Sequence, residues 1–200
     1  MTGPSLNPEI SHEDALRLGT YSVLGALLAR PPSAELLEQL SAAGGDSDSD
    51  ALGRAWSRLA TAARRAKVAD VRQEHNDVFI GVAQGEITPY ASWYRHGSLM
   101  ERPLVQVRQA LDELGVQRNS GVKEPEDHGG ALLETMALLI NAGDVDFDRE
   151  QRFFQEHLEP WLAQCFRDIQ EAPSAVFYGP VGQLGEAFMT LESHYYRMPV

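Results

Sequence analysis

The residues best suited to chemistry are gathered in one short segment, EPEDHGGALLETMALLI, which runs from Glu124 to Ile140. Its opening residues combine a proline, a histidine and three carboxylates: Glu124, Pro125, Glu126, Asp127 and His128. Carboxylates beside an imidazole can bind a metal, act as an acid–base pair, or form hydrogen bonds with cationic groups of another protein.

A metal site requires ligands that converge on one point. The chain has six histidines and one cysteine, but no H-E-x-x-H pattern and no histidine pair spaced i, i+4 around a carboxylate. Adjacent residues on a helix point in different directions, so the EDH segment cannot supply a full ligand set. We therefore predict no metal and no other cofactor. A metal-dependent enzyme that uses His128, Asp127 and Glu134 stays open as the alternative.

Acid–base catalysis could pair His128 with Asp127 or Glu134. An enzyme also needs a nucleophile or cofactor, together with an oxyanion or phosphate site. The sequence has no P-loop, no G-x-G-x-x-G and no G-x-S-x-G, and Ser92 lacks the flanking glycines of a nucleophile elbow. We predict that the protein is not an enzyme.

The same segment also has the features of a helix start. Pro125 fits a first helical turn, the acidic residues complement the helix dipole, and Asp127 can act as a cap. The apolar residues that follow are spaced to face a core: Leu132, Leu133, Met136, Leu139 and Ile140. His128 in this turn is expected to be neutral, with one hydrogen-bond donor and one acceptor, which suits recognition.

A second segment, PYASWY, concentrates aromatic side chains between residues 84 and 97. Tyr90, Trp93 and Tyr94 join apolar rings to hydroxyl or indole donors, a combination enriched at protein interfaces. Any one of them could instead fill a gap between helices. Beside an acidic segment, the aromatic segment would suit a peptide with apolar and arginine side chains.

The remaining sequence predicts an all-α fold: one globular domain over residues 1–200 with roughly nine to eleven helices. Ser11 and Asp14 form a capping box, Pro31 and Pro32 end the first helix, and Gly115 ends another. We expect an exposed acidic loop at 44–50 and an irregular aromatic loop at 84–97. Strands are at most incidental, because no alternating run is bounded by turns.

The net charge of −12 disfavours nucleic acid and favours basic peptides as partners. Cys165 is alone, so no intrachain disulfide can form, and we expect it to be a buried apolar residue. No stretch reaches the roughly 18 apolar residues of a membrane span, and no secretory signal is evident at the N-terminus. We expect a cytoplasmic protein without stable membrane insertion. Both monomers and swapped homodimers are compatible with the sequence.

PYASWY followed further along by EPEDH, in an acidic helical chain of 200 residues, resembles the TorD/DmsD-type chaperones of bacterial molybdoenzymes. The resemblance covers nearly the whole chain, including HNDVFIG at 75–81 and FYGPVGQLGEAFM at 177–189.

The resemblance implies a chaperone that binds the twin-arginine signal peptide and the apo form of a molybdoenzyme precursor, delays its export and assists cofactor insertion. Such clients include S- or N-oxide reductases, nitrate reductases and formate dehydrogenases. Matching the motifs residue by residue places the peptide-binding region on Tyr90, Ser92, Trp93, Tyr94, Glu124, Pro125, Asp127 and His128. The chain departs from the family at Leu132, an often acidic position, for which Glu134 is the nearest acidic residue.

Overall fold

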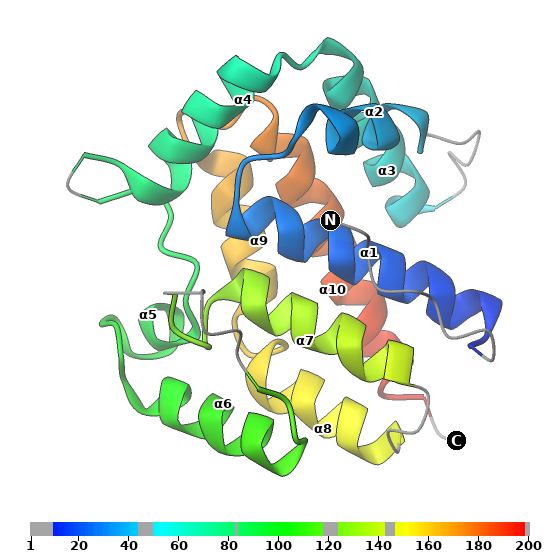
Figure 1. Ribbon diagram of the computed structural model, residues 1–200, viewed down its shortest axis with the longest axis vertical. Helices are drawn as coiled ribbons and strands as arrows, with labels where there is room; N and C mark the ends of the chain where they lie inside the picture. Colours follow the sequence, from blue (N-terminus) through cyan, green and yellow to red (C-terminus); the bar gives the residue numbers. More distant parts are fainter. Residues whose placement is uncertain (1–9, 44–49, 83, 118–123, 143–146, 199–200) are drawn as a thin grey trace. The chain divides into compact units, whose positions relative to one another are not determined.

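The computed structural model describes residues 10–43, 50–82, 84–117, 124–142 and 147–198 (Figure 1). Within these ranges the regular elements are ten α-helices and one π-helical segment, and the β-structure is one isolated bridge between Tyr90 and His128. The predicted all-α fold with nine to eleven helices is therefore confirmed. No helix in the described ranges is long and apolar enough to cross a membrane.

The chain clusters into two compact units, each built from two separate parts of the sequence. Unit 1 comprises Met1–Ala29 and Tyr90–Pro160, and unit 2 comprises Arg30–Pro89 and Trp161–Val200. The expectation of a single domain over 1–200 stays a prediction. The expected acidic loop at 44–50 lies outside the described residues except for Asp50, whose carboxylate accepts the N–H of Gly53 at 2.6 Å and so caps a helix.

Unit 1 contains five helices: α1 (His12–Ala29), α5 (Ala91–His96), α6 (Arg102–Glu113), α7 (Gly129–Ala142) and α8 (Phe147–His157). The predicted capping box begins α1, because Ser11 Oγ accepts the N–H of Asp14 at 3.0 Å and donates to its carboxylate at 2.8 Å. Helices α1 and α7 pack along each other (Figure 1). Glycines allow this close approach: a Cβ on Gly130 would lie 3.0 Å from the carbonyl oxygen of Gly25.

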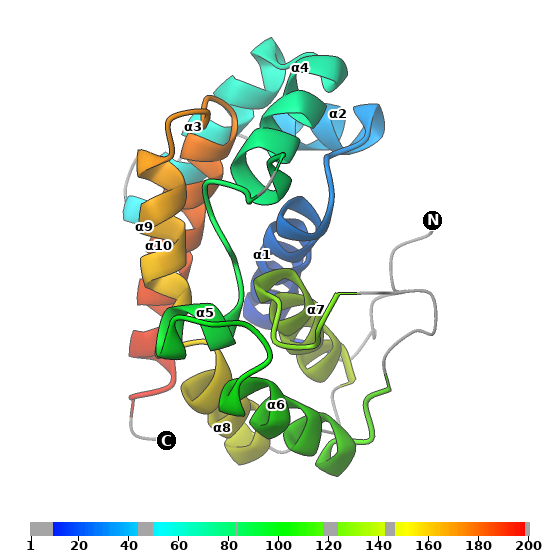
Figure 2. The same cartoon turned by 90° about the vertical axis from the view of Figure 1, so that its left-hand side faces the viewer.

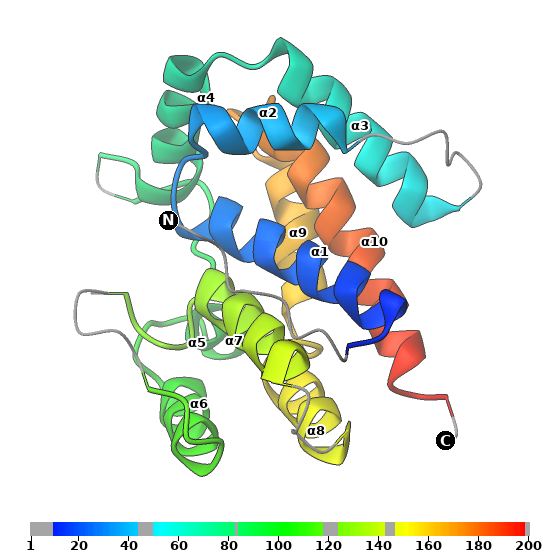
Figure 3. The same cartoon turned by 45° about the vertical axis from the view of Figure 1, so that its right-hand side comes forward.

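Unit 2 contains α2 (Ala34–Ala42), α3 (Ala51–Arg65), α4 (Val68–His75), the π segment η1 (Asn76–Ile80), α9 (Leu162–Glu171) and α10 (Tyr178–Tyr195). Helix α10 packs against both α9 and α3, and α3 also packs on α2 (Figure 3). The core of this unit includes the predicted Cys165, which is fully buried, together with Phe166, Tyr178 and Phe188.

The structure differs from the sequence-based expectation in the aromatic segment. Residues 84–97, expected to form an irregular loop, contain the short helix α5. Exposed large apolar residues in the described ranges include Leu16, Val82 and Leu99. Val82 lies beyond Gly81, whose φ of +63° ends the helical segment, so Val82 is not on the buried face of a helix.

Candidate functional site

The two motifs predicted to form a binding surface meet in unit 1 at a pair of buried side chains. The Oδ2 atom of Asp127 accepts the Ser92 hydroxyl at 2.5 Å and the Ser92 N–H at 3.0 Å. Ser92 is 0% exposed and Asp127 is 1% exposed. Because hydrogen bonds to a charged acceptor are strong when water is excluded, this pair, here called the Ser92–Asp127 clasp, fixes α5 against the segment that enters α7.

Backbone contacts extend the clasp in both directions. The Asp127 carbonyl accepts the N–H of Ala91 at 2.9 Å, and the Ser92 hydroxyl oxygen accepts the N–H of Glu101 at 3.2 Å. The start of α5, the start of α6 and the segment before α7 are thus held together (Figure 2). The other carboxylate oxygen of Asp127 is buried without a hydrogen-bond partner among the described residues.

Tyr90 and His128 form the neighbouring layer of the site. Their backbones make the isolated antiparallel bridge, and their rings meet edge to face with centroids 4.9 Å apart. The Nδ1 atom of His128 accepts the N–H of Gly130 at 3.1 Å, so a neutral His128 carries its proton on Nε2. The neutral donor–acceptor imidazole expected from the sequence agrees with this geometry.

The outer part of the site is aromatic and acidic. Trp93 is 38% exposed, Tyr90 and Tyr94 are half-buried, and Glu124 is exposed. Burial raises the pKa of Tyr90, and the negative charges of Glu124 and Asp127 raise it further. The Tyr90 hydroxyl therefore stays protonated at neutral pH and can donate a hydrogen bond next to the Glu124 carboxylate.

The start of α7 differs from its prediction. The helix begins at Gly129, so Pro125 and the carboxylates lie in the turn before it, and its first turn holds no acidic residue. Asp127 does not cap α7, because its carboxylate is directed to Ser92. His128 takes that role by accepting the Gly130 N–H. The apolar face of α7 is confirmed: Leu132, Leu133, Met136, Leu139 and Ile140 are all buried.

The metal-dependent alternative is not supported by this geometry. Asp127 bonds to Ser92, His128 bonds to Gly130 through Nδ1, and Glu134 is exposed on α7. Within the described residues no group of three or more histidine, cysteine, aspartate or glutamate side chains could hold a metal ion. Glu126 forms an ion pair with Arg108, whose Nε lies 3.0 Å from a Glu126 carboxylate oxygen.

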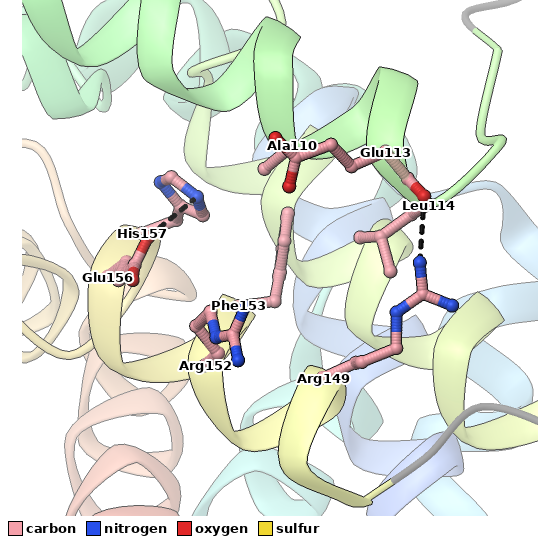
Figure 4. A pocket seen from close by; sticks show the side chains of 8 residues that line it. All are labelled: Ala110, Glu113, Leu114, Arg149, Arg152, Phe153, Glu156 and His157. Carbon is pink, nitrogen blue, oxygen red and sulfur yellow. Dashed lines mark hydrogen bonds and ion pairs between the residues drawn. The ribbon is translucent and has the colours of Figure 1, made fainter.

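Unit 1 also contains a small hollow that the sequence did not predict. A hollow of about 60 Å³ lies between α6 and α8, with Glu113, Arg149, Arg152 and His157 among its lining residues (Figure 4). Arg149 donates to the Glu113 carbonyl at 2.8 Å, as the dashed line shows (Figure 4). The sequence signal for this feature is the spacing of Phe153 and His157, which lie four residues apart and therefore on one face of a helix.

Comparison with known proteins identifies the family. The model of the family described as the nitrate reductase delta subunit matches residues 45–167. The chaperone protein TorD of Vibrio cholerae is 27% identical, over 84% of this chain and 81% of that protein. TorD of Vibrio vulnificus is 31% identical, over 60% of each chain, so that match spans less than two thirds of the relative.

The same fold occurs in a solved structure. A protein from Archaeoglobus fulgidus assigned to redox enzyme maturation aligns with a TM-score of 0.56 at 15% identity, covering 96% of this chain and 99% of the other. Together with the family match over more than half of the sequence, these findings confirm the resemblance to TorD/DmsD-type chaperones. The chain belongs to the nitrate reductase delta subunit family, which includes TorD-like chaperones.

Proposed function

We propose that this protein is a cytoplasmic chaperone that binds the twin-arginine signal peptide and the apo form of a molybdoenzyme precursor. It retains the precursor until the molybdenum cofactor has been inserted, and it assists that insertion. The observation that carries the proposal is the Ser92–Asp127 clasp, because it holds an aromatic segment beside an acidic one in a single unit. Relatives named as chaperones support the same reading.

The predicted site residues divide into two roles. Tyr90, Trp93, Tyr94 and Glu124 are exposed or half-buried, so they contact the peptide. Glu124 pairs with an arginine of the signal, while the aromatic rings cover the apolar residues and stack on the guanidinium. Ser92, Asp127 and His128 are buried and act by positioning these groups, and half-buried Pro125 shapes the turn that presents Glu124.

Titration calorimetry with a twin-arginine peptide and a twin-lysine control tests this function. Arginine binds carboxylates through two parallel hydrogen bonds and stacks on aromatic rings, whereas lysine is a point charge, so we expect binding at least about tenfold weaker for the lysine peptide. Trp93→Ala and Glu124→Gln are expected to weaken binding of the arginine peptide without changing the melting temperature. Leu191→Ala, an exposed apolar residue of unit 2, is the matched control. Equal or absent binding of the two peptides contradicts the proposal.

A further inference from the structure

Helix α3 has a charge opposite to that of the chain as a whole. The net charge of the chain is −12, yet α3 contains four arginines and no acidic residue. Ala55, Leu59, Ala60 and Ala63 form its buried face. The four arginines all lie on the exposed side: Arg54, Arg58, Arg64 and Arg65. Exposed Lys67 lies two residues after the end of the helix.

Two grooves in unit 2 border this basic helix. The first has a volume of about 370 Å³; Arg58, Arg65 and Lys67 line it together with an apolar wall of Val176, Phe177 and Pro180. The second has a volume of about 400 Å³, and its lining includes Arg54, Arg58, Gln183 and Glu186. Arg58 lines both grooves, so they adjoin along α3. Val176 is 80% exposed, which leaves the apolar wall open to solvent.

The positive charges of the first groove are poorly compensated. The side chains of Arg65 and Lys67 make no hydrogen bond or ion pair with any residue in the described ranges. Arg58 donates to the neutral amide of Gln183 at 2.9 Å. Glu74 also lines the groove, but its two oxygens already accept N–H groups at the start of α10. Asp70 is the remaining acidic side chain of the lining.

The acidic residue of the second groove is also engaged. The Glu186 carboxylate accepts from Arg167 at 3.3 Å and from Gln170 at 2.9 Å. Along α3 the two grooves therefore present guanidinium and ammonium groups beside apolar surface, a combination that matches carboxylates spaced between apolar side chains.

We propose that these grooves, here called the α3 basic surface, bind an acidic segment of a partner protein in an extended or helical form. The carboxylates of the segment pair with Arg58, Arg65 and Lys67, while its apolar side chains cover exposed Val176 and half-buried Pro180. A small anion would occupy one groove only, whereas α3 extends over about 22 Å and both grooves follow it. A nucleic acid is disfavoured by the overall negative charge. This surface lies in unit 2 and is independent of the signal-peptide proposal.

Fluorescence anisotropy tests the α3 basic surface with a labelled synthetic peptide of alternating glutamate and leucine. The matched probe has glutamine at each glutamate. At low ionic strength we expect the wild-type protein to bind the acidic peptide at least about tenfold more tightly than the glutamine peptide. The double variant Arg58→Glu/Arg65→Glu is expected to lose about tenfold or more in affinity for the acidic peptide. Arg65→Gln/Lys67→Gln removes two charges without reversing them. We expect this variant to lose less affinity for the acidic peptide than Arg58→Glu/Arg65→Glu.

The control variant is Arg30→Glu/Arg102→Glu, which makes the same charge change at two exposed arginines that line neither groove. Its affinity for the acidic peptide is expected to stay within about twofold of wild type, because a change in net charge away from the grooves is largely screened. Equal losses in the control and groove variants, or no preference for the acidic peptide, overturn the proposal. So does full displacement of the peptide by millimolar inorganic phosphate, which would indicate a small-anion site. Twin-arginine peptide binding, measured in parallel on the groove variants, is expected to be unchanged.

Discussion

At the scale of single residues, the surroundings of His157 determine its protonation state. Burial lowers the pKa of His157 to about 4, and the positive charge of Arg95 adds to the effect. The Glu156 carboxylate lies 4.0 Å from Nε2 and favours the charged form, but it is 61% exposed and screened by water, so burial dominates. His157 is therefore neutral in the folded protein throughout the neutral range.

This lowered pKa predicts loss of stability in mild acid. The unfolded chain, where the pKa is about 6.5, binds a proton on His157 between about pH 6.5 and 4, whereas the folded protein does not. The contribution is fully present above pH 6.5, and the free energy of unfolding falls by on the order of 3 kcal/mol as pH drops to about 4. Urea denaturation at a series of pH values measures this effect. We expect the free energy of unfolding to depend less steeply on pH in His157→Gln than in the wild type. Exposed His96→Gln is the control, and an unchanged slope in His157→Gln contradicts the assignment.

The Ser92–Asp127 clasp shows what residue types and spacing could and could not predict. Both motifs were recognisable in the sequence, and the site residues they contain lie together in unit 1. Their roles were not recognisable, because a serine and an aspartate far apart in sequence carry no local sign that they bond and become buried. Tyr90 and Trp93 are accessible, as an interface requires. Ser92 and Asp127 are buried and hold the accessible residues in position.

At the scale of elements, the N-terminus of α10 is capped by a residue from another helix. Glu74 at the end of α4 accepts the N–H groups of Val176, Phe177 and Tyr178 at 2.8, 3.0 and 2.7 Å. These donors have no partner within α10, and the carboxylate also complements the positive end of the helix dipole. Phe177, the residue before α10, makes no side-chain cap hydrogen bond, so the residues next to Tyr178 do not mark where this helix begins.

Removing this carboxylate is expected to destabilise unit 2. Glu74→Ala leaves three N–H groups without their acceptor, so we expect a loss of about 2 kcal/mol in the free energy of unfolding. Glu74→Gln keeps one acceptor oxygen and is expected to lose about half as much. Thermal or urea denaturation measures both, with exposed Glu38→Ala on α2 as the control. A Glu74→Ala variant as stable as the control would show that water replaces the cap without loss.

At the scale of the whole molecule, the chain passes between its two units at prolines. The boundaries fall beside Pro31–Pro32, at Pro89 and at Pro160. Proline interrupts helices, so the sequence did indicate where elements end, and the helix count followed from those signals. It did not indicate which elements share a unit, because that depends on packing between residues distant in sequence, such as Gly25 with Gly130.

The net charge of −12 predicts how binding of a twin-arginine peptide responds to salt. A negatively charged protein attracts the peptide from a distance, and this attraction is screened as the Debye length falls from about 10 Å at 0.1 M to about 3 Å at 1 M salt. We expect the affinity for the arginine peptide to fall by about tenfold over that range, mainly through slower association. A peptide with glutamine in place of both arginines is expected to bind weakly and to respond little to salt. Stopped-flow fluorescence measures both rates, and salt-independent association of the arginine peptide contradicts a contribution of overall charge.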